Sequence, residues 1–305
     1  MPETPFPGIH GLDTFQFREA ITTLKASWSL VSLNEIVQAL DNKGSLPEKA
    51  CLISLDDGLR CQYEVALPIL DDLNVPGVFY VLGAPYIKRK AATVHQLHYI
   101  RANHGDQLLI DMINETVVKD SQLESIDSID QAIAAQHYRY DSPASAKLKY
   151  YLNYKSTPDF TRRITREAFS RIGMNEAEFI QNYYMNRSMI KELGSRGYLG
   201  SHAETHLPLA TLSSADVRKE LSSTREFLEA VSDTKVTSIS YPLGNSEAVS
   251  REVADIALQM GHRIGWTMER AVNQSLADPL LLARLDAADR DNIETFEPRQ
   301  RYFTE

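Results

Sequence analysis

Cysteine is scarce in this sequence, since Cys51 and Cys61 are the two present among 305 residues. Two cysteines cannot build a disulfide framework, so the fold must depend on a hydrophobic core. An apolar content of 43% at this length is sufficient for one. No apolar run comes near the roughly 20 residues that cross a bilayer. Residues 1–8 lack the basic region and apolar core of a signal peptide. We therefore expect a cytoplasmic protein with no transmembrane segment.

Positive charge is also in short supply, because 32 Lys and Arg face 41 Asp and Glu and the formal net charge is -9. This balance disfavours a nucleic-acid partner, and we expect none. Residues 145–171 are the exception. Seven basic and two acidic side chains give this segment a net charge of +5. It indicates an anionic ligand, with a solvated helix face as the alternative.

The pattern along the chain is that of an α/β protein. An amphipathic helix is predicted over Thr14–Trp28, and Ser32–Glu35 has the form of a capping box that opens a second helix. Apolar runs of strand length at Ala50–Leu55 and Gly77–Leu82 flank a helical stretch, which predicts a parallel sheet. Further strands are predicted at 198–200, 236–241, 264–268 and 280–285, with helices at 214–231 and 247–260.

A long polar and helical stretch interrupts this pattern between about residues 85 and 187. We predict one (β/α) barrel domain over residues 1–305, into which this mainly helical insertion is placed. The insertion is expected to cover the mouth of the sheet or barrel.

Two short motifs follow predicted strands. Asp56-Asp57-Gly58 comes after the first apolar run, and His202–His206 (His-Ala-Glu-Thr-His) comes after the strand at 198–200. Ligands of α/β sheets bind beyond the carboxyl ends of strands. One Asp with two His leaves a fourth position open for water, as in a catalytic zinc site, while the second carboxylate can handle a proton. The strand must end or bend for both carboxylates to reach the site, and Gly58 permits this. The motifs predict metal-assisted hydrolysis, although such triplets also occur in turns and such histidines on surfaces.

These motifs resemble those of the polysaccharide deacetylase family, also called the NodB-homology or carbohydrate esterase 4 family. Ser54–Gly58 (Ser-Leu-Asp-Asp-Gly) is similar to its first motif, which usually reads Thr-Phe-Asp-Asp-Gly, and His202–His206 is similar to its second. Ile239–Gly244 (Ile-Ser-Tyr-Pro-Leu-Gly) is similar to its third, in the Tyr-Pro-x-Gly form of one branch. The similarity extends over roughly residues 12–84 and 184–287.

The resemblance implies a distorted (β/α) barrel with fewer than eight complete strands. Asp57, His202 and His206 would bind one divalent metal, zinc in the first place and nickel, cobalt or iron as alternatives. Asp56 would be the catalytic base. The backbone N–H of Leu243, at the family's aromatic position after proline, would point at the oxyanion.

The activity that the resemblance implies is removal of an N-acetyl or N-formyl group from an amino sugar, by hydrolysis of a C–N bond that is not a peptide bond. The substrate would be a cytoplasmic precursor of a surface polysaccharide. The basic segment at 145–171 further predicts a phosphate-bearing substrate, such as a nucleotide-linked or lipid-linked sugar. Tyr241 of the third motif and Tyr140 of the insertion are candidate substrate contacts, with core packing as the alternative for the tyrosines of the insertion.

The chain departs from the family pattern in three places. Ser240 stands where the family often has an Arg that orients the base, and Arg284 is expected to take that role, with a strand-end salt bridge as the alternative. The family's C-terminal histidine acid is missing. His262 is expected to be structural, and His10 is another candidate acid. The first strand, which usually carries Tyr-His, is absent or reduced.

These departures keep two other functions open. One is a metal-independent hydrolase of a non-sugar C–N bond, which chelation would not inhibit. The other is a catalytically inactive glycan-binding protein, against which the intact Asp and His motifs argue.

Overall fold

The computed structural model describes residues 11–119, 123–138 and 141–296. Five parallel strands form one sheet in sequential order, β3-β4-β5-β6-β7. The strands are β3 (Ile53–Leu55), β4 (Gly77–Val81), β5 (Leu199–Ser201), β6 (Ser238–Ser240) and β7 (Ile264–Trp266). A helix lies in the chain between each strand and the next, which is the arrangement of an incomplete (β/α) barrel. The predicted α/β fold class is confirmed.

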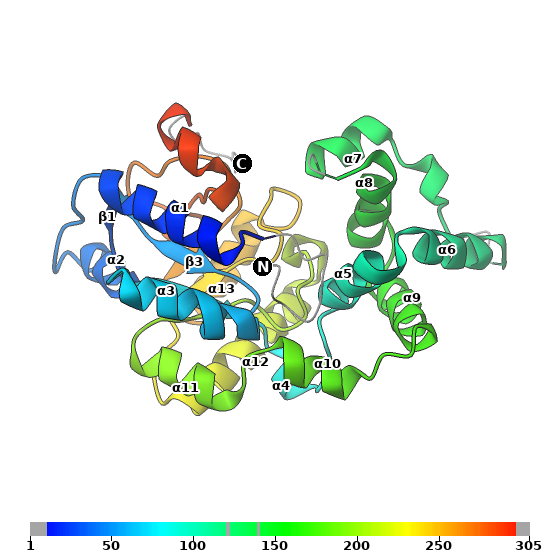
Figure 1. Cartoon of the computed structure of the whole chain (residues 1–305), viewed down its shortest axis with the longest axis horizontal. Coiled ribbons are helices and arrows are strands. Elements are labelled where there is room, and N and C mark those ends of the chain that lie inside the picture. The colour runs from blue at the N-terminus through cyan, green and yellow to red at the C-terminus, as the bar shows by residue number, and fades with distance from the viewer. Residues whose placement is uncertain (1–10, 120–122, 139–140, 297–305) are drawn as a thin grey trace. The chain divides into compact units, whose positions relative to one another are not determined.

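The helices between the strands lie beside the sheet in Figure 1, and each of them buries apolar side chains. They are α3 (Leu67–Asp72), α11 (Arg187–Ser195), α12 (Ser214–Ser232) and α13 (Arg251–Gln259). Strand β4 is buried at every residue, as its continuous apolar run predicts for a strand covered on both faces. The core beside it includes Leu70, Ile190 and Leu228, none of which is exposed to solvent.

The helices before the sheet start where their capping residues predict. Helix α1 spans Thr14–Ser27, and α2 spans Leu33–Leu40. At α2, the Ser32 backbone N–H donates to Glu35 at 2.7 Å and the Glu35 N–H donates to the Ser32 hydroxyl at 3.3 Å. The predicted capping box is confirmed.

Two predicted strands differ in the structure. The apolar run at 50–55 divides at Leu52, because β2 (Ala50–Cys51) pairs with β1 (Ser29–Leu30) while β3 pairs with β4. The run at 280–285 is not a strand and makes one bridge, from Leu282 to Trp266. Beyond this bridge the backbone N–H and C=O of Ala283 bond to the Asn273 side chain at 2.9 Å, so the ladder ends there.

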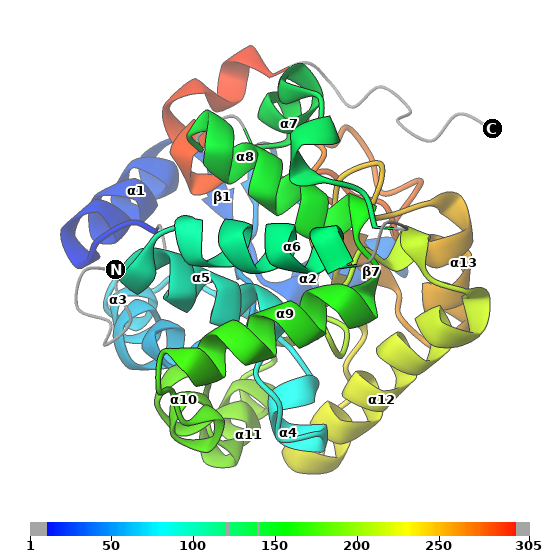
Figure 2. The ribbon, with the colours of Figure 1, turned by 90° about the vertical axis from the view of Figure 1, so that its right-hand side faces the viewer.

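The chain divides into two compact units, and the second is Ala91–Phe179 together with a stretch near the N-terminus that includes no described residue. The described secondary structure of this second unit is helical, with turns between the helices. Its helices are α5 (Thr93–His104), α6 (Gln107–Lys119), α7 (Gln131–His137), α8 (Pro143–Tyr150) and α9 (Pro158–Arg171), and α10 (Glu176–Tyr183) begins within it. Helix α9 packs along α5 and α6, as Figure 2 shows. The insertion is therefore mainly helical, as predicted, while its place over the barrel mouth stays a prediction.

The remaining elements are short. They are α4 (Ala84–Ile87), the π-helices η1 (Gln62–Ala66) and η3 (Tyr151–Lys155), and the 3-10 segments η2 (Ile126–Ser128), η4 (Leu209–Thr211) and η5 (Ala287–Thr295). Across the described ranges, no helix combines the length and the apolar character that a membrane crossing requires.

Candidate metal centre

The turn after β3 directs both carboxylates of the first motif away from the sheet ladder. The strand ends at Leu55, and Asp57 and Gly58 have φ values of 85° and 68°. A Cβ on Gly58 would lie 2.9 Å from Cγ1 of Val81 and 3.2 Å from its Cα, so only glycine fits. The positive φ of Asp57 is unfavourable for a residue with a side chain, and such strain is common at functional sites. The prediction that the chain bends at Gly58 is confirmed.

Gln62 holds this turn in place. Its buried side-chain amide donates to the Asp56 carbonyl and accepts the Leu59 N–H at 3.1 Å. Gln62 begins the π-helix η1, a type of helix that is frequent at functional sites. No sequence pattern predicts this role of Gln62, because a glutamine after a turn has no distinguishing feature.

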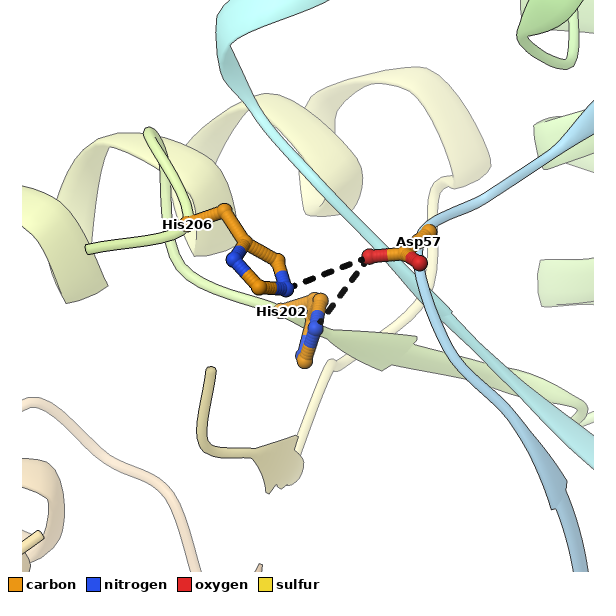
Figure 3. Close-up of side chains that lie close together, drawn as sticks. All are labelled: Asp57, His202 and His206. Carbon is orange, nitrogen blue, oxygen red and sulfur yellow. Dashed lines mark ion pairs between the residues drawn. The ribbon is translucent and has the colours of Figure 1, made fainter. Parts of the chain in front are cut away.

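The second motif forms a loop after β5 that presents two imidazoles to Asp57. Nε2 of His202 lies 3.4 Å from Oδ1 of Asp57, and Nε2 of His206 lies 3.6 Å from the same oxygen. Figure 3 shows both rings directed at this carboxylate. Ala203 and His206 have φ values of 56° and 60°, so this loop carries left-handed residues as the Asp57 turn does. The three ligand atoms all lie within 4.8 Å of one another.

His202 is oriented by the neighbouring strand. Its ring is buried, and its Nδ1–H donates to the Ser240 carbonyl at 2.6 Å, which leaves Nε2 toward Asp57. Such a bond sets the tautomer of a metal-binding histidine. Burial would lower the pKa of His202, but the carboxylates of Asp56 and Asp57 outweigh it and raise the pKa. The same negative charge favours a cation at this place.

The donor set of one carboxylate oxygen and two imidazole nitrogens suits zinc and related divalent metals. These three donors can hold such an ion and leave a coordination position open for water. The structure thus brings together Asp57, His202 and His206, the residues predicted as metal ligands.

Asp56 is held by two residues that are distant in sequence. Nη1 and Nη2 of Arg284 donate to its two carboxylate oxygens at 2.9 and 2.7 Å, and the Ser240 hydroxyl donates to Oδ2 at 2.9 Å. Burial would raise the pKa of Asp56, but the Arg284 guanidinium, with His202, holds it below its ordinary value. Arg284 is therefore paired with the candidate base, and Ser240 also contacts that base from the position where the family has Arg.

The third motif places Leu243 in a strained turn, with φ of 61°. Gly244 follows with the same φ, and a Cβ there would lie 2.6 Å from the Met268 nitrogen. The Leu243 N–H donates to none of the residues that the structure describes. This N–H group follows Ser240, the partner of Asp56, by three residues in the chain. Its lack of an acceptor fits the predicted oxyanion role, which stays a prediction.

The expected substrate contact of Tyr241 is wrong. Its side chain is fully buried, and its hydroxyl donates to the Leu280 carbonyl at 2.9 Å, so the ring packs in the core. Tyr140 and His10 lie outside the described residues. His262 is fully buried, and neither ring nitrogen has a hydrogen-bond partner within the described part of the chain, as suits its predicted structural role.

Comparison with known proteins supports the same family. A family model described as polysaccharide deacetylase matches residues 151–265. The matched stretch contains both histidines and the third motif, and the fold adds Asp56 and Asp57 from outside it. The predicted resemblance is confirmed. The chain matches none of the curated proteins.

Several solved structures share the fold. IcaB from Ammonifex degensii is 14% identical with a TM-score of 0.55, covering 95% of this chain and 92% of that one. The Streptococcus pyogenes deacetylase PplD in complex with acetate is 14% identical with a TM-score of 0.54, covering 93% and 86%. The BpsB deacetylase domain from Bordetella bronchiseptica is 14% identical with a TM-score of 0.52, covering 92% and 89%. At these identities the likeness concerns the fold.

Proposed function

We propose that the chain, in which a polysaccharide deacetylase family model matches residues 151–265, is a metal-dependent N-deacetylase of an amino sugar in a carbohydrate. It hydrolyses the amide C–N bond between the acyl group and the sugar nitrogen. The observation that carries the proposal is the convergence of Asp57, His202 and His206 beside the Asp56–Arg284 pair. A cation site next to an oriented carboxylate is what hydrolysis of a stable amide by water requires.

The residues divide the chemistry among them. Asp57, His202 and His206 would hold a divalent cation, which would lower the pKa of a water molecule to about 7 and polarise the acyl oxygen. Asp56 takes the proton from the attacking water, because its neighbours keep it ionised. The Leu243 N–H donates to the negative charge that develops on the acyl oxygen.

The substrate and the metal are proposed more narrowly. The donor set favours zinc, and the acyl group is acetyl or, as an alternative, formyl. The substrate is a precursor of a surface polysaccharide, met in the cytoplasm. Two free cysteines, Cys51 and Cys61, suit a reducing compartment. Cell fractionation with an antibody against the native protein tests this location.

The first experiment is elemental mass spectrometry of the purified protein. Near-stoichiometric zinc, nickel, cobalt or iron is expected, with loss of the metal in His206→Ala. His104→Ala is the matched control, since His104 is exposed on α5 in the other unit. Acyl release from N-acyl amino sugars should then stop on chelation and return with metal. A protein that takes up no metal even after reconstitution contradicts the proposal and favours a metal-independent or binding function.

The basic segment at 145–171 motivates the phosphate-bearing substrate. Arg162 and Arg163 both lie on helix α9. Arg162 forms an ion pair with Asp159, and the Arg163 guanidinium lies 5.5 Å from the centre of the Phe160 ring. Reversing both charges to Glu should raise KM for a phosphate-bearing sugar several-fold and leave KM for its neutral analogue unchanged. An unchanged KM for the phosphate-bearing sugar would contradict this prediction and would indicate that the two arginines belong to a solvated helix face.

A further inference from the structure

The loop between the two candidate metal ligands is fixed by polar contacts from outside the motif. It has two left-handed residues, Ala203 and His206, so its shape is not one that the backbone prefers. Gly83 and Ala84 donate their N–H groups to the carbonyls of Ala203 and Glu204 at 3.0 and 2.9 Å. These bonds account for two loop acceptors and leave the loop's own donors to be paired.

Glu220 of helix α12 pairs those donors. Its Oε2 accepts the backbone N–H groups of Glu204 and Thr205 at 3.0 and 2.8 Å, and its Oε1 accepts the Thr205 hydroxyl at 2.6 Å. Glu220 is 8% exposed. One side chain therefore fixes two consecutive peptide groups between His202 and His206.

Burying the Glu220 carboxylate in this place costs free energy, because a second carboxylate is buried nearby. Glu204 is buried within the same loop, where its carboxylate pairs with Lys88 and accepts the Ser223 hydroxyl. Two carboxylates, Glu204 and Glu220, are thus buried close together with Lys88 as the cation. Burial of charged groups is costly unless they are fully hydrogen-bonded, and an apolar residue would serve packing alone at less cost.

We infer that Glu220 is a positioning residue of the metal centre, and this inference rests on the proposed function. By holding the Glu204 and Thr205 peptides, Glu220 sets the path of the loop and so places Nε2 of His206 opposite Asp57. Its hydrogen bonds within the described residues reach the Glu204 and Thr205 peptides and the Thr205 hydroxyl, so it acts through the loop. Outer residues of this kind commonly change metal affinity by about 10–100-fold when they are replaced.

The geometry separates the effects of four variants. Glu220→Ala leaves both N–H groups without their acceptor. Glu220→Asp keeps the charge but is one methylene too short to reach both peptides. Glu220→Gln keeps an oxygen for the two N–H groups, and its amide can donate to the Thr205 hydroxyl. Glu226→Ala changes an exposed carboxylate of the same helix and is the matched control.

The experiment is a zinc titration of each metal-free protein against a chromophoric chelator, with far-ultraviolet circular dichroism to verify folding. Zinc affinity should fall about 10–100-fold in Glu220→Ala and Glu220→Asp. Glu220→Gln should stay within about threefold of wild type, and Glu226→Ala should equal it. If Glu220→Ala does not fold, the contrast between the Asp and Gln variants decides.

Folded Ala and Asp variants with wild-type zinc affinity would overturn the inference while the proposed metal site stands. A Gln variant as weak as the Asp variant would also overturn it, because an oxygen that still reaches both peptide N–H groups would then not preserve the zinc affinity. Wild-type protein that binds no zinc, or any other of the candidate metals, overturns the proposed function itself.

Discussion

Removal of Arg284 should change the pH at which Asp56 becomes active as a base. Arg284 donates two hydrogen bonds, at 2.9 and 2.7 Å, to the two oxygens of this carboxylate. A cation in such contact stabilises the ionised form and commonly lowers a carboxyl pKa by about 1–3 units. The guanidinium therefore favours the ionised form of Asp56, and its removal favours the protonated form.

The sign of the effect follows from the role of Asp56. The base is active when it has lost its proton, and its pKa in the folded protein lies below the ordinary value. In Arg284→Met that pKa rises, so the acidic limb of the kcat/KM profile should move to higher pH. The plateau should fall as well, because the Ser240 hydroxyl is then the remaining donor that orients the carboxylate.

Two variants separate charge from geometry. Arg284→Lys keeps a cation but loses the two-pronged contact, so its acidic limb should stay near that of wild type while kcat falls. Ser240→Ala removes one neutral donor and should move the limb less than Arg284→Met does. Metal content must be equal in all variants, as elemental analysis can verify. An unmoved acidic limb in folded, metal-loaded Arg284→Met would refute the claim that Arg284 controls the ionisation of Asp56.

Three further predictions concern stability and can be measured by denaturant or thermal unfolding. Gly58→Ala should destabilise the protein by about 2–4 kcal/mol, since the new Cβ meets Val81 and the positive φ is unfavourable; a loss below about 1 kcal/mol would mean that the turn relaxes easily. Gln62→Ala should cost about 1–3 kcal/mol, because the Leu59 N–H loses its partner, whereas Gln62→Glu should lose mainly the bond to the Asp56 carbonyl. Burial lowers the pKa of His262 to about 3, so the unfolded chain binds a proton that the folded one does not as pH falls below about 6.5. From pH 7 to pH 5 this group should remove about 2 kcal/mol of stability, and His262→Phe should lack that part of the pH dependence; equal slopes in both proteins would contradict the assignment.

Local patterns in the sequence were sufficient for much of the fold. The capping box at Ser32 and Glu35 and the fully buried strand β4 depend on neighbours within a few residues, and the structure has both. The motifs at Asp57 and at His202–His206 were also readable, because each follows a strand and parallel strands end at one edge of the sheet. What a residue does within its own turn or strand is thus largely a local property.

Tertiary structure decided which distant groups meet. Arg284 and Asp56 are 228 residues apart, and no local pattern states that their side chains pair. The apolar run at 50–55 divides because its halves bond to different partner strands. Tyr241 was expected at the substrate, yet its hydroxyl bonds to the Leu280 carbonyl in the core. Nothing in the sequence distinguishes Glu220 from the other glutamates of helix α12. Its contact with the histidine loop depends on the face that α12 presents, and only the packing of the helix on the sheet determines that face.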